Sequence, residues 1–196
     1  MTTKSDYVQI ALHAKTVSIA HSLAAIYALY ESNELDIPEE IKCFEWNLLG
    51  ILGEFALSTY LTGGIAAALI SRHNGIANAL QGKPFDYGHD LPALNVDCKT
   101  TRNRANHQLC GLHLLVHPRH VRNSRAYVLA VLDEPKDGDV GRIQPLSVQL
   151  VGWCYGRELE AAVNPNSFTG AHRLKAINLR PMSTLHVEDI RLRECA

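Results

Sequence analysis

The chain has 196 residues, 46% of them apolar, and a formal net charge of −1 at pH 7. A chain of this length and composition can bury one good hydrophobic core, so we expect a single domain spanning residues 1–196. Its five cysteines are scattered without a Cys-x-x-Cys pair, which argues against a disulfide framework or a thiolate zinc site and favours the reducing cytoplasm. The apolar run at residues 63–70 is too short to cross a bilayer, and no basic segment with a following apolar stretch opens the chain. We therefore expect a cytoplasmic protein without a membrane partner.

Charge is distributed unevenly along the chain. Residues 1–60 carry eight Asp or Glu against three Lys. Residues 98–132 contain no acid and carry six basic residues, namely Lys99, Arg102, Arg104, Arg119, Arg122 and Arg125. Such a segment is either a solvated basic surface or a contact for a polyanion. Its position directly after a cluster of carboxylates favours the polyanion.

The first 82 residues have the apolar spacing of helices. Apolar residues recur every three or four positions over residues 5–30, which predicts a long amphipathic helix that packs as scaffold. Asp36 and Pro38 are start signals for a second helix, which should end near Gly63. For residues 65–82 we expect a further helical segment and a loop.

Glu54 is the only charged residue between Trp46 and Ser71. It lies about 110° from the centre of the apolar stripe of the second helix, on the flank of the buried face, where a helix can present a side chain to the edge of a sheet. Burying an isolated carboxylate is costly, so a positive group should meet it. That group is either a metal ion or a buried arginine.

From residue 85 onward the pattern changes to turn signals and period-two alternation. Residues 95–101 alternate, so Asp97, Lys99 and Thr101 should share one face of a strand and Val96, Cys98 and Thr100 the other. A turn at residues 92–95 can close a hairpin and bring Asp90 beside Asp97. Further elements are expected as strands at residues 111–116, 127–132 and 148–154, a turn at Asp137-Gly138 and a short helix after Gly156.

Three groups of residues have competing interpretations. His107, His113, His117 and His120 are a rival zinc-binding set, but the surrounding residues suggest a strand ending in a turn, on which they would spread too far apart. Trp153 and Tyr155 could stack on bases, although packing in the core or a hairpin is favoured. Asp97 and Lys99 could themselves be an ordinary ion pair on one strand face.

The order of these features resembles the PD-(D/E)XK nuclease superfamily, which has the restriction-endonuclease-like fold. The resemblance covers residues 50–159 and rests on Gly53-Glu54 in a helix, Asp86-x-Gly88-x-Asp90, Asp97-x-Lys99-Thr100-Thr101, the strand at 127–132 and the segment at 151–159. His89 stands where the family has a proline before the metal-binding Asp. Asp86 therefore competes with Asp90 for that role, and we favour Asp90 because it is closer to Asp97.

The resemblance implies an α/β (α+β) fold with a mixed central β-sheet flanked by helices. The single nuclease-like domain would comprise an N-terminal helical scaffold (residues 1–35), a catalytic core (36–160) and a C-terminal extension (161–196). The resemblance also implies a Mg²⁺ site, with Mn²⁺ as a substitute, in which Asp90 and Asp97 bind the ion, Glu54 completes the site and Lys99 orients or activates the attacking water. The products would carry 5′-phosphate and 3′-hydroxyl ends.

We therefore expect a Mg²⁺-dependent DNA endonuclease of restriction, phage or repair type. Its DNA contacts would come from Arg102, Arg104, Arg119, Arg122, Arg125 and Thr101. A homodimer is compatible with the sequence. The alternatives are a catalytically silent nucleic-acid-binding or assembly protein that keeps the nuclease fold, and a nuclease subunit that acts only inside a larger complex.

Overall fold

The structure, a computed structural model, describes residues 7–35, 40–81, 91, 94–103, 108–121, 123–132, 146–162, 171–186 and 188, without the side chains of 31–35, 40–42, 110 and 119. These parts form a mixed α/β fold. The helices are α1 (Ala14–Leu35), α2 (Glu40–Thr62), α3 (Ala66–Leu80) and α4 (Gly156–Ala161). The strands are β1 (Val8–Leu12), β2 (Val96–Arg102), β3 (His113–Val116), β4 (Ala126–Leu132), β5 (Leu146–Tyr155) and β6 (His172–Lys175).

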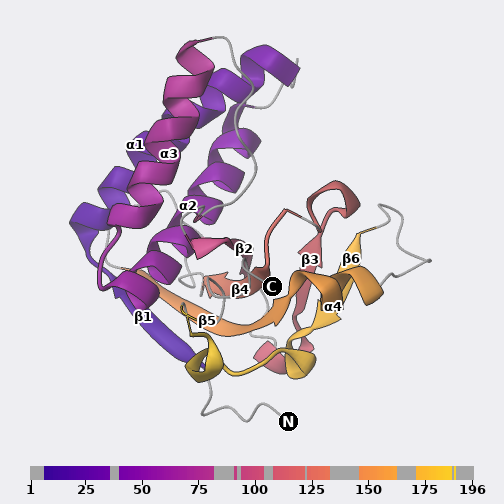
Figure 1. Ribbon diagram of the computed structural model, residues 1–196. Coiled ribbons are helices and arrows are strands. Elements are labelled where there is room, and N and C mark those ends of the chain that lie inside the picture. The colour runs from indigo at the N-terminus through magenta and orange to yellow at the C-terminus, as the bar shows by residue number, and fades with distance from the viewer. Residues whose placement is uncertain are drawn as a thin grey trace.

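The main sheet is mixed and has the strand order β1-β5-β4-β2. Strands β2 and β4 run parallel, whereas β5 is antiparallel to both β4 and β1. Strands β3 and β6 form a separate two-stranded antiparallel sheet. The three long helices gather on one side of the main sheet, and β3, β6 and α4 lie together at the other end of the molecule (Figure 1).

Strand β4 is the centre of the molecule, and all seven of its residues are buried. Val128 and Ala130 belong to the core formed with the long helices, which includes Phe55. Tyr127 and Leu129 belong to a second core that includes residues of β3 and β6. A strand covered on both faces requires a continuous apolar run, and the sequence Ala-Tyr-Val-Leu-Ala-Val-Leu provides one.

The end of α2 is set by local backbone chemistry. Gly63 has φ +78°, and its N–H donates to the carbonyl oxygen of Thr59 at 2.9 Å. A residue without Cβ adopts this left-handed conformation at little cost, which makes it a common helix terminator. The chain then turns into α3, which packs beside α2.

The prediction of a helix over residues 5–30 is wrong for residues 8–12, which form a strand. Residues Val8–Leu12 form β1, which pairs with β5 from Val8↔Leu150 to Leu12↔Leu146, and the helix starts only at Ala14. The apolar residues Val8, Ile10 and Leu12 also fit the two-residue repeat of a strand. This segment forms a strand because it pairs with β5, which lies far along the chain.

The other expected elements that fall within the described residues are confirmed. The second helix, the strand with Asp97, the strands at β3, β4 and β5 and the short helix α4 all form near the predicted positions. The mixed sheet flanked by helices is confirmed as well, whereas a restriction-endonuclease-like core stays a prediction. The turn at Asp137-Gly138 lies outside the described residues.

The C-terminal segment is part of the packed fold. Leu179 and Met182 are buried, and the backbone of Arg180 pairs with that of Trp153 through two hydrogen bonds of 3.0 and 2.8 Å. Gly152 permits this approach, because a Cβ there would lie 2.7 Å from the carbonyl oxygen of Arg180.

Candidate functional site

Asp97 and Lys99 form an ion pair on the strand β2, with 2.7 Å between Lys99 Nζ and Asp97 Oδ1. The side chain of Asp97 is 4% exposed and that of Lys99 is 35% exposed. The acid is therefore held under the ammonium group, which reaches the solvent. The prediction that the two side chains share a face is confirmed.

The pair lies on the face of the main sheet opposite the long helices. Asp97 stands beside Tyr127 in the β2–β4 register and Lys99 beside Leu129, and both neighbours belong to the core with β3 and β6. Burial raises the pKa of the Tyr127 phenol, the negative charge of Asp97 adds to this effect, and the backbone N–H of Ser124 and the charge of Lys99 oppose it. The charges of Asp97 and Lys99 thus affect a phenol on the side of the main sheet that faces β3 and β6.

A hairpin joins the start of β2. Leu91 pairs with Val96 in an antiparallel bridge, its N–H donates to the Val96 carbonyl at 3.1 Å, and the Leu94 N–H donates to the Leu91 carbonyl at 2.9 Å. Asn95 has φ +53°, a conformation that asparagine tolerates in turns, and its side-chain oxygen accepts a hydrogen bond from the Arg125 N–H at 3.0 Å. The expected return of the chain beside β2 is therefore confirmed at Leu91, whereas Asp86 and Asp90 lie outside the described residues.

The positive group that meets Glu54 is Arg72 of α3. Glu54 is 1% exposed, and both of its carboxylate oxygens accept hydrogen bonds from the guanidinium group, one of them 2.7 Å from Arg72 Nε to Glu54 Oε2. The guanidinium also lies over the ring of Tyr27, 4.8 Å from its centroid, and the Tyr27 hydroxyl donates to the Arg72 carbonyl at 3.0 Å. Residues of all three long helices are therefore joined through Arg72, which contacts Tyr27 of α1 and Glu54 of α2.

Arg72 was not identified as a candidate from the sequence, although a signal for it exists. It is the first charged residue after Glu54, and a turn at Gly63-Gly64 lies between them. Two helices joined by such a turn run back along each other, which can bring residues 18 positions apart into contact. The expectation that a positive group meets Glu54 is confirmed by Arg72.

Helix α2 packs against the face of β2 that points away from Asp97. A Cβ at Gly53 would overlap the Thr100 side chain, so helix and strand are in direct contact there. Among the described residues, no group of three or more His, Cys, Asp or Glu side chains is placed to hold a metal ion. Convergence of Glu54, Asp90 and Asp97 on one ion thus stays a prediction.

The expected DNA-binding residues differ in accessibility. The Arg102 side chain is 10% exposed and reaches Glu45 of α2 at 3.3 Å, whereas Arg125 and Thr101 are half-buried. The remaining arginines, at positions 104, 119 and 122, have side chains outside the described part of the chain. Because Arg102 is covered and faces an acid, it is the least accessible to a phosphate of the three described candidates.

The histidines do not form a described zinc site. His113 lies on β3, and the rings of His117 and His120 have centroids 6.0 Å apart. Asn123 Nδ2 lies 3.3 Å from His120 Nδ1, so His120 has a neighbour that occupies one ring nitrogen. His107 lies outside the described residues.

Trp153 and Tyr155 form the packed cluster that the sequence favoured. Trp153 is 3% exposed, its indole N–H donates to Pro181 O at 3.1 Å and Thr184 Oγ1 at 3.0 Å, and its ring meets that of Tyr155 edge to face. Arg180 lies over both rings and forms two hydrogen bonds to Glu158, one of 2.6 Å.

The described thiols lie in the interior of the protein. Cys43, Cys98 and Cys154 are all free and buried. Burial, with a smaller contribution from the nearby Glu158 charge, raises the pKa of the Cys154 thiol to about 12. A thiol of that pKa stays protonated at neutral pH and is a poor nucleophile.

Comparison of the chain with protein-family models, with curated proteins and with solved structures found no significant match. Within the described residues, no helix is both long and apolar enough to cross a membrane.

Proposed function

We propose that the protein is a Mg²⁺-dependent endonuclease that hydrolyses DNA phosphodiester bonds. The observation that carries the proposal is the ion pair of Asp97 and Lys99 on β2, beside a hairpin that returns at Leu91. A carboxylate can bind a hard cation and an adjacent ammonium group can contact a phosphate, and both groups suit metal-assisted phosphodiester cleavage.

Asp97 and Asp90 would hold the Mg²⁺ ion. We assign the second acid to Asp90 in preference to Asp86 because Asp90 is closer to Asp97 in the sequence, and the residue that follows it, Leu91, pairs with Val96 beside Asp97. Mg²⁺ bound by one or two carboxylates keeps positions for water and substrate phosphate, so this small donor set suits it. When bound, the ion would polarise the phosphoryl oxygen and lower the pKa of a coordinated water.

Lys99 would act on the phosphate. Its ammonium group is partly exposed and is held by Asp97, so it can approach an anionic substrate while remaining oriented. There it would stabilise the negative charge that develops as water attacks phosphorus, and it would orient that water. Asp97 thus has two tasks, holding the cation and positioning the lysine.

Glu54 has a narrower part in this proposal than the family resemblance implies. Arg72 engages both of its oxygens. A direct bond from Glu54 to the metal would require Arg72 to release an oxygen. We therefore assign metal binding first to Asp97 and Asp90.

The test is cleavage of plasmid, branched and single-stranded DNA by the purified chain with Mg²⁺, Mn²⁺ or EDTA. We expect cleavage that depends on the metal, its loss in Asp97→Asn, and a reduction of about a hundredfold or more in Lys99→Ala with DNA affinity nearly kept. Glu160→Gln, which removes a surface acid from α4, is the matched control and should cut like the wild type. Full activity of Asp97→Asn would reject the assignment.

A silent nucleic-acid-binding protein is the second candidate. It is favoured by the observation that Glu54 and Asp97 both have internal cationic partners, Arg72 and Lys99. A protein of this kind would bind DNA in EDTA but cut none of the substrates with any divalent metal. The same result would be expected of a subunit that acts only within a larger complex, and activity restored by cell extract would distinguish that case.

A further inference from the structure

The small sheet formed by β3 and β6 presents one face to the solvent. In its register His113 is opposite Lys175 and Leu115 is opposite Arg173. Strand alternation places these four side chains on one side, while Leu114 and Val116 are buried on the other. Leu115, Arg173 and Lys175 are exposed, and His113 is half-buried. We call these four residues the β3–β6 face.

Positive groups on this face are close together and are not neutralised by a described acid. Arg173 Nη2 lies 3.1 Å from His113 Nδ1. Burial lowers the pKa of His113, and the charges of Arg173 and then Lys175 lower it further. Among the described residues, neither Arg173 nor Lys175 forms an ion pair with a carboxylate. An anion placed here would be attracted by both cations.

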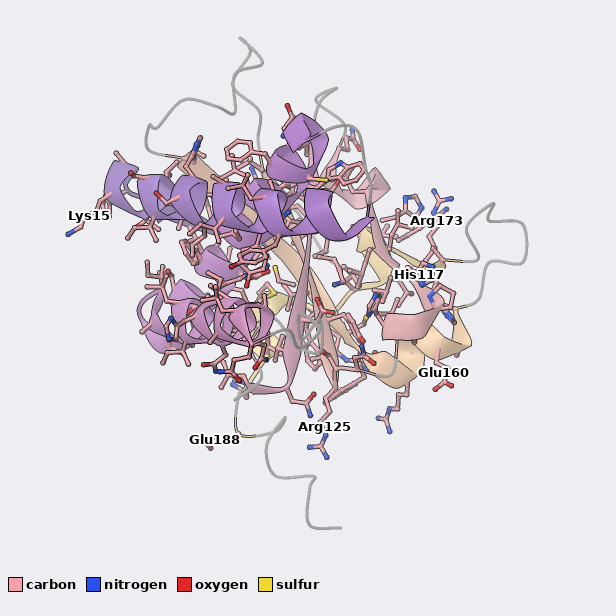
Figure 2. The ribbon with its side chains drawn as sticks, turned by 90° about the horizontal axis from the view of Figure 1, so that it is seen from above. Lys15, His117, Arg125, Glu160, Arg173 and Glu188 are labelled. Carbon is pink, nitrogen blue, oxygen red and sulfur yellow. The ribbon has the colours of Figure 1, made fainter. Side chains whose placement is uncertain are left out.

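The small sheet covers the same side of the main sheet as the Asp97–Lys99 pair, and its β3–β6 face is turned outward, away from the main sheet. The buried residues of β3, Leu114 and Val116, pack with Tyr127 and Leu129, and the latter two stand beside Asp97 and Lys99 in the register of the main sheet. Figure 2 shows Arg173 and His117 on one flank of the molecule and Lys15 of α1 on the opposite flank.

We propose that the β3–β6 face binds the phosphodiester backbone of the DNA substrate and extends the contact beyond the bond that is cut. The identity of the partner rests on the proposed function. Arg173 and Lys175 are two residues apart on one strand, which separates them by about 6.6 Å. Two nucleotides of a DNA strand advance by about the same distance along the helix axis, so each cation can contact a phosphate of its own.

Double-stranded DNA fits this face better than an anionic membrane does. Leu115 is the one large exposed apolar side chain of the face. A membrane-binding surface requires an apolar area that enters the lipid in addition to its basic residues. A backbone contact requires only cations at phosphate spacing and is independent of base sequence.

The test is the salt dependence of binding to a labelled duplex, measured by fluorescence anisotropy in EDTA so that no cleavage occurs. We expect Arg173→Ala and Lys175→Ala each to lower the log–log slope by about 0.9 and the affinity roughly eightfold at about 0.1 M salt. Arg173→Lys should retain the slope. Lys15→Ala, which removes an exposed lysine from the opposite flank, is the matched control and should bind like the wild type.

Three outcomes would overturn the inference. One is wild-type slope and affinity in both alanine variants. Another is an equal loss in Lys15→Ala, which would make the effect one of net charge. The third is that the alanine variants lose binding to phosphatidylserine vesicles while keeping duplex binding. Failure of the proposed function is separate from all three, because a chain that never cuts DNA can still show the expected slopes in EDTA.

Discussion

At the scale of single residues, Glu54 and Arg72 hold opposite charges in a place that is nearly closed to water. The Glu54 side chain is 2% exposed and the Arg72 side chain 18%. Pairing offsets the hydration that each group loses on burial. When one partner is removed, the remaining buried charge is uncompensated and lowers the stability of the fold. The pair therefore fixes the relative positions of α2 and α3 whether or not Glu54 takes part in chemistry.

Replacing one partner of this pair should destabilise the fold more than replacing both. We expect Arg72→Met to lower the free energy of unfolding by about 3–5 kcal/mol, because it leaves a buried carboxylate without its cation. Glu54→Leu combined with Arg72→Met should recover much of that loss. Urea unfolding of the single and double variants measures the difference. A single variant as stable as the wild type would show that the pair does not hold the helices.

A second expectation at this scale concerns His113. Removing a neighbouring positive charge favours protonation, so Arg173→Ala should raise the pKa of His113 towards its ordinary value, and Lys175→Ala should raise it less. Burial, the largest cause, remains, so the pKa should stay below the ordinary value in both variants. Titration of the imidazole resonances by NMR follows this directly, with Lys15→Ala as a control that should leave the His113 pKa unchanged.

At the scale of elements, helix α2 and strand β2 approach each other through Gly53. A Cβ at that position would lie 3.0 Å from Thr100 Cβ and 3.1 Å from Thr100 Cγ2. A threonine on a strand has few alternative rotamers, so it cannot easily move aside. At Gly50, one turn earlier, a Cβ would meet its nearest atoms at 3.9 and 4.0 Å, which is ordinary contact.

The two glycines of α2 should therefore respond oppositely to alanine. Gly53→Ala should lower the free energy of unfolding by about 1–3 kcal/mol through overpacking. Gly50→Ala should be neutral or should raise it by up to about 1 kcal/mol, because alanine favours a helix interior. Thermal or urea unfolding of both variants decides this. Adding Thr100→Ala should reduce the cost at Gly53, and a cost that stays unchanged would argue against a clash at this contact.

Elements and faces that depend on short-range pattern were predictable, whereas those that depend on distant partners were not. The alternation of residues 95–101 places Asp97 and Lys99 on one face because side-chain direction on a strand repeats every two residues. The helical spacing of residues 5–30 was misleading at β1, because its strand partner, β5, lies far along the chain. The Arg72 partner of Glu54 likewise depends on how α2 and α3 pack, which no local window contains.

At the scale of the whole molecule, the C-terminal segment is bound to the core by Arg180 and Glu158. The hydrogen bond from Arg180 lowers the pKa of the Glu158 carboxyl, burial opposes this, and the Tyr155 N–H and further positive charges assist it. The folded protein therefore favours the ionised carboxylate. This contribution to stability is present above the pKa of the unfolded chain and is lost as the pH falls through the lower pKa of the folded state.

Glu158→Gln should accordingly destabilise the protein near neutral pH and have a progressively smaller effect in acid. The measurement is the free energy of unfolding of this variant and of the wild type across the acidic range. Glu160→Gln, on the same helix, is the control for the loss of one negative charge. A difference between Glu158→Gln and the wild type that does not change with pH would contradict the role of the ionised pair.

The pairing of β1 with β5 also has a consequence for the order of events during synthesis. Gln9 of β1 donates a hydrogen bond of 2.7 Å to Ser147 of β5, its partner 138 residues later. At about 5–20 residues per second, a ribosome adds those residues in about 7–28 s. Throughout that interval β1 exists without its neighbour β5, so this edge of the main sheet is completed late, when β5 captures a strand that was synthesised well before it.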